Sequence, residues 1–389
     1  MSPTTLQELV EDLAQQLNAP ALMLCPHCDS TVPQGHFCGH CGAHLSTADT
    51  SRRHSFAAMP NEPVVHFNVI STLFPHLPHR RGGPFRWALV AGAVFVLLLV
   101  TLSLYAPATA AATALLPALY LLYLYEVEVY DEEPWLLIGA TMLAGAALGY
   151  IYATLLGSAS SQFQITGDNG TNFLVSAVGS PIVAQILMLA GPVLLFLIRG
   201  RSYREPLDGL TFGAASALGF SLASELTSLW PIITGPLLGS GQPVDWALRL
   251  LRLGILLSLV NASTTAVVAA ALWLHRYDLK RSQRTWEVSV PVTLLVAFGV
   301  QLVLGVLTFV VPELVAQVLV WALAAVALML YMRQVIHQAL LAEGSLHEIG
   351  PDSQCPECHR IVPTMAFCPN CGAARAAAPR SSRPRRAAI

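Results

Sequence analysis

Eight cysteines are the residues of this chain best suited to hold a metal, and they stand in two groups of four. Each group is two Cys-x-x-Cys pairs separated by nine residues. One such pair places two thiolates on one side of an ion, and a second pair completes a tetrahedral set of four sulfurs, which suits Zn²⁺. Redox-active pairs or disulfides are the alternatives. The spacing predicts two zinc ions, with ligands Cys25, Cys28, Cys38 and Cys41 in one group and Cys355, Cys358, Cys368 and Cys371 in the other.

The two cysteine groups are copies of one another. They align without a gap at an offset of 330 residues, and Val32-Pro33 matches Val362-Pro363 while Phe37 matches Phe367. A closed four-thiolate site has no open position for substrate, so the expected role of the metal is structural. Both segments resemble the zinc-ribbon modules often attached to bacterial membrane proteins. Thiolates that bind metal also favour a reducing compartment.

Polar side chains in the apolar middle of the chain are the second candidate for chemistry, because polar groups are costly at membrane depth. Glu225 is the one acid well inside an apolar segment, and it is either protonated and hydrogen-bonded or functional. Gln185 and Asn261 are either functional or hydrogen-bond partners between helices. The remaining polar positions singled out are Ser216, Ser224, Ser258, Thr264, Thr265 and Gln301.

These residues must be positioned by membrane-spanning helices. Hydrophobic residues make up 54% of the chain and charged residues 11%, against about 25% charged in soluble domains. A spanning helix needs about 20 mostly apolar residues. Eight segments qualify: 87–106, 108–125, 134–156, 173–198, 209–230, 253–274, 288–311 and 314–333. The predicted fold is an all-α polytopic membrane protein of about eight transmembrane helices with two small β-rich zinc ribbons.

The placement of Lys and Arg predicts the orientation of these helices. With eight spans, the basic connections fall on one side, while 157–172 and 231–246 contain no Lys or Arg. Both termini are therefore expected in the cytoplasm, with the chain embedded in the cell's inner (plasma) membrane. Glu126–Glu133 is an acidic stretch on the same side, which acts as a docking surface or is simply a solvated loop.

Composition also predicts the domain order. We expect an amphipathic helix over 1–20, a ribbon over 21–46, a linker over 47–84, the transmembrane domain over 85–336, a linker over 337–350, a ribbon over 351–374 and a disordered basic tail over 375–389. The lipid bilayer is the first partner. A net charge of −2, and ribbons without basic clusters and interleaved aromatics, argue against nucleic acid and for a protein partner.

The membrane segment resembles the PrsW family of intramembrane proteases, which are membrane-embedded metalloproteases. The resemblance covers about 110–310 and rests on three runs: Glu132-Glu-Pro-Trp-Leu-Leu-Ile138, Pro181-Ile-Val-Ala184-Gln185, and Leu207-Asp-Gly209 followed by Gly213 and Gly219-Phe220. The last run is the most specific of the three.

The chain departs from the family at the residues that the resemblance would make catalytic. Where the family has a Glu-Glu pair this chain has Ala184 and Gln185, and where a basic residue follows it has Met188. The family's later acid falls on Ser224, one residue before Glu225, and its His falls on Asn261, with a further polar position at Gln301. A displaced Glu points about 100° away around a helix from the residue before it.

These departures predict the loss of catalysis. A metal-activated water needs carboxylate or imidazole ligands and a base, whereas amides cannot act as bases near neutral pH. We infer a catalytically inactive PrsW-like scaffold, sensor or client-binding protein, whose partners are a protein bound by the ribbons or a membrane-anchored client. An active protease that uses Glu225 and a transporter with polar groups lining a path are the alternatives.

Overall fold

The computed structural model describes residues 21–26, 30–42, 45, 83–126, 135–166, 173–199, 206–236, 241–277, 288–344, 349–355 and 358–372. The chain divides into two compact units: one contains both cysteine groups, and the other contains the apolar helices. The predicted helix over 1–20, nearly all of the linker over 47–84 and the tail over 375–389 lie outside the described residues.

Helices occupy all eight predicted apolar segments. Two of them begin in π-helical form, in which the backbone bonds skip one more residue than in an α-helix. The elements are α3 Gly83–Thr101, α4 Tyr105–Glu126, α5 Trp135–Thr166, η3 Leu174–Gly179 leading into α7 Ser180–Arg199, α8 Pro206–Ser228, α9 Trp230–Ile233, α10 Pro243–Leu250, η4 Leu251–Leu257 leading into α11 Ser258–Tyr277, α12 Val290–Val310 and α13 Leu314–Gly344.

Six of the helical segments among the described residues are long and apolar enough to cross a membrane. The two predicted spans that do not meet this measure fail it for different reasons. In α3 the apolar part, Trp87–Thr101, is too short. In α8 the apolar residues are diluted by Asp208, Glu225 and many Ser and Gly residues. The fold is thus mostly helical and multi-pass, as predicted, and six of the eight predicted spans are clear spans among the residues that the structure describes.

Two predicted boundaries differ from the structure. The break between the first two spans was placed near Pro107, but α3 ends at Thr101, and Ser103 adopts a positive φ of 59° before α4 begins. Pro107 lies in the first turn of α4, where proline leaves no helical hydrogen bond unmade. At the other end α13 continues to Gly344, so much of the predicted linker over 337–350 is helical.

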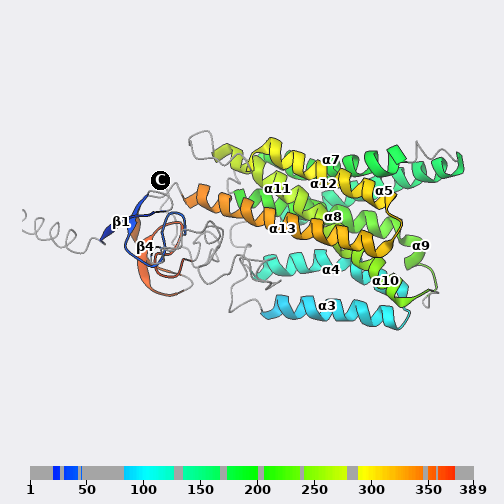
Figure 1. Ribbon diagram of the computed structural model, residues 1–389, viewed down its shortest axis with the longest axis horizontal. Coiled ribbons are helices and arrows are strands. Elements are labelled where there is room, and N and C mark those ends of the chain that lie inside the picture. The colour runs from blue at the N-terminus through cyan, green and yellow to red at the C-terminus, as the bar shows by residue number, and fades with distance from the viewer. Residues whose placement is uncertain are drawn as a thin grey trace, which may run out of the picture. The chain divides into compact units, whose positions relative to one another are not determined.

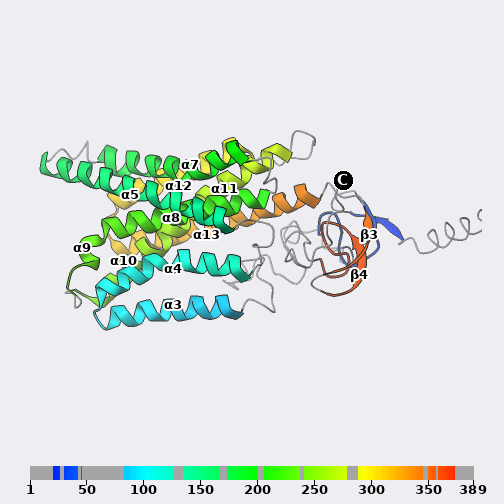
Figure 2. The ribbon, with the colours of Figure 1, turned by 180° about the vertical axis from the view of Figure 1, so that it is seen from behind.

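Helix α8 lies inside the bundle, as Figures 1 and 2 show from opposite sides. Phe212, Ala215 and Ser216 are fully buried on it. A Cβ at Gly219 would overlap the carbonyl oxygen of Met142 on α5, and one at Gly213 would lie 2.8 Å from the Cα of Ala266 on α11. The small residues of α8 therefore let two helix backbones approach it closely, as small residues do in membrane bundles.

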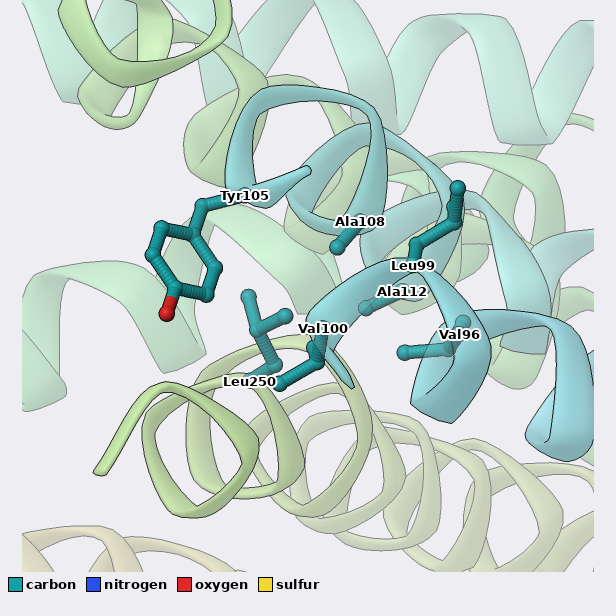
Figure 3. Close-up of a cluster of buried hydrophobic side chains, with 7 residues drawn as sticks. All are labelled: Val96, Leu99, Val100, Tyr105, Ala108, Ala112 and Leu250. Atoms are coloured by element: carbon teal, nitrogen blue, oxygen red, sulfur yellow. The ribbon is translucent and has the colours of Figure 1, made fainter. Parts of the chain in front are cut away.

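A separate apolar cluster joins α3, α4 and the helix that leads into α11 (Figure 3). Its members are Val96, Leu99, Val100, Tyr105, Ala108, Ala112 and Leu250. The ring of Tyr105 stacks on Trp246 with centroids 4.6 Å apart, and its hydroxyl donates to the carbonyl oxygen of Gly241 at 3.1 Å. These contacts hold Gly241, just before α10, and Trp246 against the start of α4.

The two cysteine groups form antiparallel hairpins of the same register. Strand β1 (Leu22–Leu24) pairs with β2 (Thr31–Pro33), and β3 (Gly350–Gln354) pairs with β4 (Ile361–Thr364). Met23 faces Val32 in the first hairpin, and Ser353 faces Val362 in the second. Both pairs of partners are related by the same offset of 330 residues, so the internal repeat of the sequence is a repeat of structure.

Candidate functional site

Two clusters of thiols sit where the sequence predicted metal sites. Cys355, Cys358, Cys368 and Cys371 bring their sulfurs within 4.8 Å of one another, and so do Cys25, Cys38 and Cys41. The eighth predicted ligand, Cys28, lies outside the described residues. No disulfide joins the described cysteines to one another, so the disulfide alternative finds no support among them.

The thiol clusters have the dimensions of a tetrahedral metal site. The sulfurs of Cys355 and Cys371 are 3.7 Å apart, and those of Cys358 and Cys368 are 3.8 Å apart. In the other cluster Cys25 and Cys41 are separated by 3.8 Å. Metal–sulfur bonds of about 2.3 Å at tetrahedral angles give a sulfur–sulfur edge of about 3.8 Å. The thiols therefore fit a four-coordinate metal.

Glycines allow the chain to leave each cluster. Gly42 and Gly372 follow the last cysteine of each group and have positive φ values of 73° and 69°. Their N–H groups donate to the carbonyl oxygens of Cys38 and Cys368 at 2.9 and 2.7 Å. A residue with a side chain is disfavoured in this conformation, which explains the glycine at both equivalent positions.

A second candidate site is a cluster of buried polar side chains inside the helical unit. Gln185 comes from α7, Asn261 from α11 and Gln301 from α12, and their exposed fractions are 0%, 6% and 4%. The amide nitrogen of Gln301 lies 2.8 Å from Oδ1 of Asn261 and 3.3 Å from Oε1 of Gln185. The three positions that the PrsW resemblance singles out on separate helices thus meet at one place.

Hydroxyl groups complete the hydrogen bonding of these amides. Thr264 lies 3.0 Å from Oε1 of Gln185, whose own amide nitrogen donates to Thr265 at 3.3 Å. The amide nitrogen of Asn261 donates to the hydroxyl of Ser221 on α8 at 2.9 Å. The polar cluster, meaning Gln185, Ser221, Asn261, Thr264, Thr265 and Gln301, is therefore a connected network across four helices.

Glu225 lies next to this network. It is one helical turn beyond Ser221 on α8, it is 5% exposed, and its Oε1 accepts from the hydroxyl of Ser258 at 2.9 Å. Its Oε2 has no hydrogen-bond partner among the described residues. Ser224 is only half-buried, and its hydroxyl bonds back to the carbonyl oxygen of Ser221. The inward position of this turn is therefore that of Glu225, not that of the family's acid.

Ala184 stands apart from the hydrogen bonds of the cluster. It is half-buried and packs against the apolar group formed by Met188, Ala217 and Phe220. This is the position at which the resemblance places the first glutamate of the pair. A methyl group there supplies packing and no donor atom.

Both π-helical segments end four to six residues before a member of the polar cluster. Segment η4 ends at Leu257, immediately before Ser258 and Asn261, and η3 ends at Gly179, shortly before Gln185. A π-turn shifts the face that the following helix presents, and such turns are common at functional sites. The hydropathy of the sequence does not reveal these π-helical segments. It does not single out Ser221 either, and the one signal for that residue is its place four residues before Glu225.

The donor set of the polar cluster does not fit a catalytic metal. Zn²⁺ in proteins is bound by thiolate, imidazole and carboxylate, and the cluster offers amides and hydroxyls with Glu225 at its edge. Among the described residues of the helical unit, no three His, Cys, Asp or Glu side chains bring ligand atoms together. What the arrangement can do is hold four helices in register through neutral hydrogen bonds.

A comparison with known protein families bears on this cluster. The family described as PrsW family intramembrane metalloprotease matches residues 133–336, more than half of the chain and the whole of the polar cluster. The match confirms the resemblance drawn from the sequence runs. No curated protein and no solved structure matches this chain.

Proposed function

This chain belongs to the PrsW family of intramembrane metalloproteases, and from that premise we propose that it is a member without catalytic activity. It keeps the family's helical scaffold and acts as a scaffold, a sensor or a protein that binds a membrane-anchored client. Its two zinc ribbons bind a protein partner.

One observation carries this proposal: Gln301 donates to both Gln185 and Asn261. These residues stand where the resemblance puts a glutamate, a histidine and a further polar group. Because the three side chains meet at one place, they support the assignment of these positions to the family's site. Because all three are neutral amides, they support the loss of reactivity. An amide has neither the basicity to take a proton from water nor useful affinity for zinc.

The ribbons supply the zinc of this proposal. Sulfur–sulfur distances of 3.7 and 3.8 Å match about 3.8 Å for tetrahedral Zn²⁺, and four thiolates favour zinc over the harder cations. Each ion closes its site with four protein ligands, so it stabilises the ribbon and takes no part in hydrolysis.

The proposal places both termini in the cytoplasm. The two ribbons donate backbone hydrogen bonds to one another, which supports the placement of both ends on one side of the bilayer and an even number of crossings. The basic connections argue that this side is the cytoplasm, where thiols stay reduced. The membrane is then the cell's inner (plasma) membrane.

Metal content tests this proposal. We expect two zinc ions per chain in the detergent-purified protein and none after all eight cysteines are replaced by serine. A zinc ion that survives the cysteine replacement would reveal a metal site in the membrane core and would contradict the loss of catalysis. The helical unit should remain folded in the variant, as circular dichroism would check, because the apolar helices form a compact unit of their own.

Residual proteolysis is a second candidate, and Glu225 favours it. Its buried carboxylate has one oxygen without a partner among the described residues and lies one turn from the polar cluster. The test co-reconstitutes the protein with a panel of single-span reporter proteins in liposomes. Cleavage that Glu225→Gln abolishes and Ser224→Ala leaves intact would establish this activity, and uncut reporters would leave the scaffold reading in place.

A further inference from the structure

The two ribbons, built from opposite ends of the chain, contact each other through reciprocal backbone hydrogen bonds. The N–H of Phe37 donates to the carbonyl oxygen of Pro369 at 3.0 Å, and the N–H of Phe367 donates to that of Gly39 at 2.8 Å. Residues 37 and 367 are equivalent in the repeat, and so are 39 and 369. Each ribbon therefore offers the same surface to the other, which is the arrangement of a two-fold symmetric interface.

These hydrogen bonds begin and end beside metal ligands. Phe37 and Gly39 flank Cys38, and Phe367 and Pro369 flank Cys368. Each of these cysteines belongs to its own thiol cluster. A change in the backbone at one ligand therefore acts directly on the backbone next to a ligand of the other site.

Close packing accompanies the hydrogen bonds. A Cβ at Gly35 would lie 2.6 Å from the carbonyl oxygen of Pro369, and one at Gly39 would overlap the sulfur of Met365. Met365 and Phe367 are buried, at 6% and 0% exposed. The interface thus has no room for an added side chain at Gly35, where the obstacle is backbone, and at Gly39 the side chain of Met365 would have to move.

Each hairpin is too short to be stable by itself. Their strands are three to five residues long, and an isolated two-stranded hairpin is marginally stable in water at best. Small zinc modules are typically folded with metal and unfolded without it. The folding of each ribbon therefore depends on its own ion and on its neighbour.

We infer that the two zinc sites are thermodynamically coupled, so that filling one raises the zinc affinity of the other. The inference rests on the proposal that the ribbons bind zinc. When one site loses its ion, its second Cys-x-x-Cys pair loses its fixed backbone, and the two inter-ribbon hydrogen bonds and the packing of Phe367 are lost with it. The remaining ribbon must then bind zinc without that support.

Coupling makes the pair of ribbons respond to zinc as one unit. Withdrawal of either ion weakens the other site, and it separates the two ends of the chain. The surface of the ribbon pair that a partner protein would bind exists only when both ions are present.

A chelator competition on the full-length protein in nanodiscs tests the coupling. Zinc per chain is measured as a chromophoric chelator is titrated, for the wild type, for Cys25→Ser/Cys38→Ser and for Cys355→Ser/Cys368→Ser. Coupling between sites is commonly about 5- to 150-fold in affinity. We expect each variant to keep one zinc that is bound at least about ten-fold more weakly than the same site in the wild type. Because coupling is reciprocal, the factor should be the same in both directions.

Two single variants separate coupling from simple damage to a site. Gly35→Val keeps all eight cysteines and drives a side chain into the carbonyl oxygen of Pro369. Gln34→Val adds the same side chain at the neighbouring exposed position. Gly35→Val should lower the zinc affinity of both sites, including the site in the unmutated C-terminal ribbon. Gln34→Val should leave both affinities unchanged.

The outcomes distinguish this inference from the proposal on which it rests. A wild-type protein without zinc would refute the zinc ribbons themselves. Two zinc ions in the wild type, with unchanged affinity of the remaining site in both cysteine variants, would leave the ribbons standing and refute the coupling. Loss of both ions in either cysteine variant would mean that one ribbon cannot hold zinc alone, which supports the coupling if Gly35→Val also weakens both sites.

Discussion

Replacing Gln301 with leucine removes the donor that joins Asn261 to Gln185. The side chain is 4% exposed, and its amide nitrogen makes a 2.8 Å bond to Oδ1 of Asn261 and a longer one of 3.3 Å to Oε1 of Gln185. A buried acceptor left without its donor costs about 1–3 kcal/mol. Hydrogen bonds between membrane helices are worth less, on average about 0.6 kcal/mol and at most about 1.7 kcal/mol. The short bond should dominate, because Gln185 also accepts from Thr264 at 3.0 Å. We expect Gln301→Leu to lower the free energy of unfolding by about 1–2 kcal/mol.

A double-mutant cycle isolates the bond itself. Reversible unfolding in bicelles, followed by steric trapping, gives the free energies for Gln301→Leu, Asn261→Leu and the double variant. The expected interaction energy between the two positions is about 1 kcal/mol. Thr141 serves as the matched control, since its hydroxyl bonds to Leu137 within its own helix. Gln301→Leu and Thr141→Val should be additive within about 0.5 kcal/mol.

The result that would refute this reasoning is additivity between Gln301 and Asn261. It would mean that the two amide side chains do not stabilise each other, and it would contradict a closed network of neutral hydrogen bonds. An increase in stability on Gln301→Leu would point the same way, because it would mean that lipid-like packing is worth more at this position than the hydrogen bonds.

Three further predictions concern packing, the lost site and the ribbons. Gly219→Val would drive a side chain into the carbonyl oxygen of Met142 and should lower the free energy of unfolding by about 3 kcal/mol. Gly299→Val is the control, because a Cβ there meets nothing within 4 Å, and it should leave the free energy of unfolding nearly unchanged. Combining Ala184→Glu, Gln185→Glu and Asn261→His in the eight-cysteine-to-serine background should create one metal site per chain, measured by elemental analysis; no bound metal would argue against the assigned positions. Removing zinc with a chelator should expose the ribbons to limited proteolysis while the helical unit stays resistant, and equal resistance of the ribbons with and without chelator would contradict a structural role for zinc.

The ribbons could be predicted from the sequence because their determinants are local. Cysteine type and spacing define the site, and a glycine after the last cysteine is required by its positive φ. Their contact with each other could not be predicted in the same way. It is made by backbone groups of residues 37, 39, 367 and 369, and backbone groups leave no trace in residue types.

The helices followed from hydropathy, but the role of α8 did not. Its polar and small residues keep it out of the set of clear spans, although it has some of the most deeply buried side chains of the bundle. Hydropathy measures what a helix would gain by facing lipid. A helix that faces other helices is selected instead for close approach, as at Gly213 and Gly219.

The meeting of Gln185, Asn261 and Gln301 was predictable only through the family resemblance. The three residues are separated by 76 and 40 positions in the sequence, and no periodicity connects them. The sequence singled out Glu225, but for a related reason it did not predict which helix Glu225 faces. The family's motif favoured position 224, whereas the packing of α8 against α11 turns position 225 toward Ser258.

The polar cluster also shows how a PrsW-family membrane core with amides at these positions can be stable under the proposed loss of catalysis. A glutamate and a histidine at positions 185 and 261 would need a metal or each other to be stable at membrane depth, because an unpaired charge is costly there. Glutamine has the shape of glutamate and asparagine is smaller than histidine, and both exchange those charges for hydrogen bonds that the neighbouring helices can satisfy. Each amide has both donors and an acceptor, so Gln301 can join the two without any ion. A network that is satisfied in this way fixes the register of the helices. The neutrality that lets the amides bond to one another is also the reason for proposing that the site is unreactive.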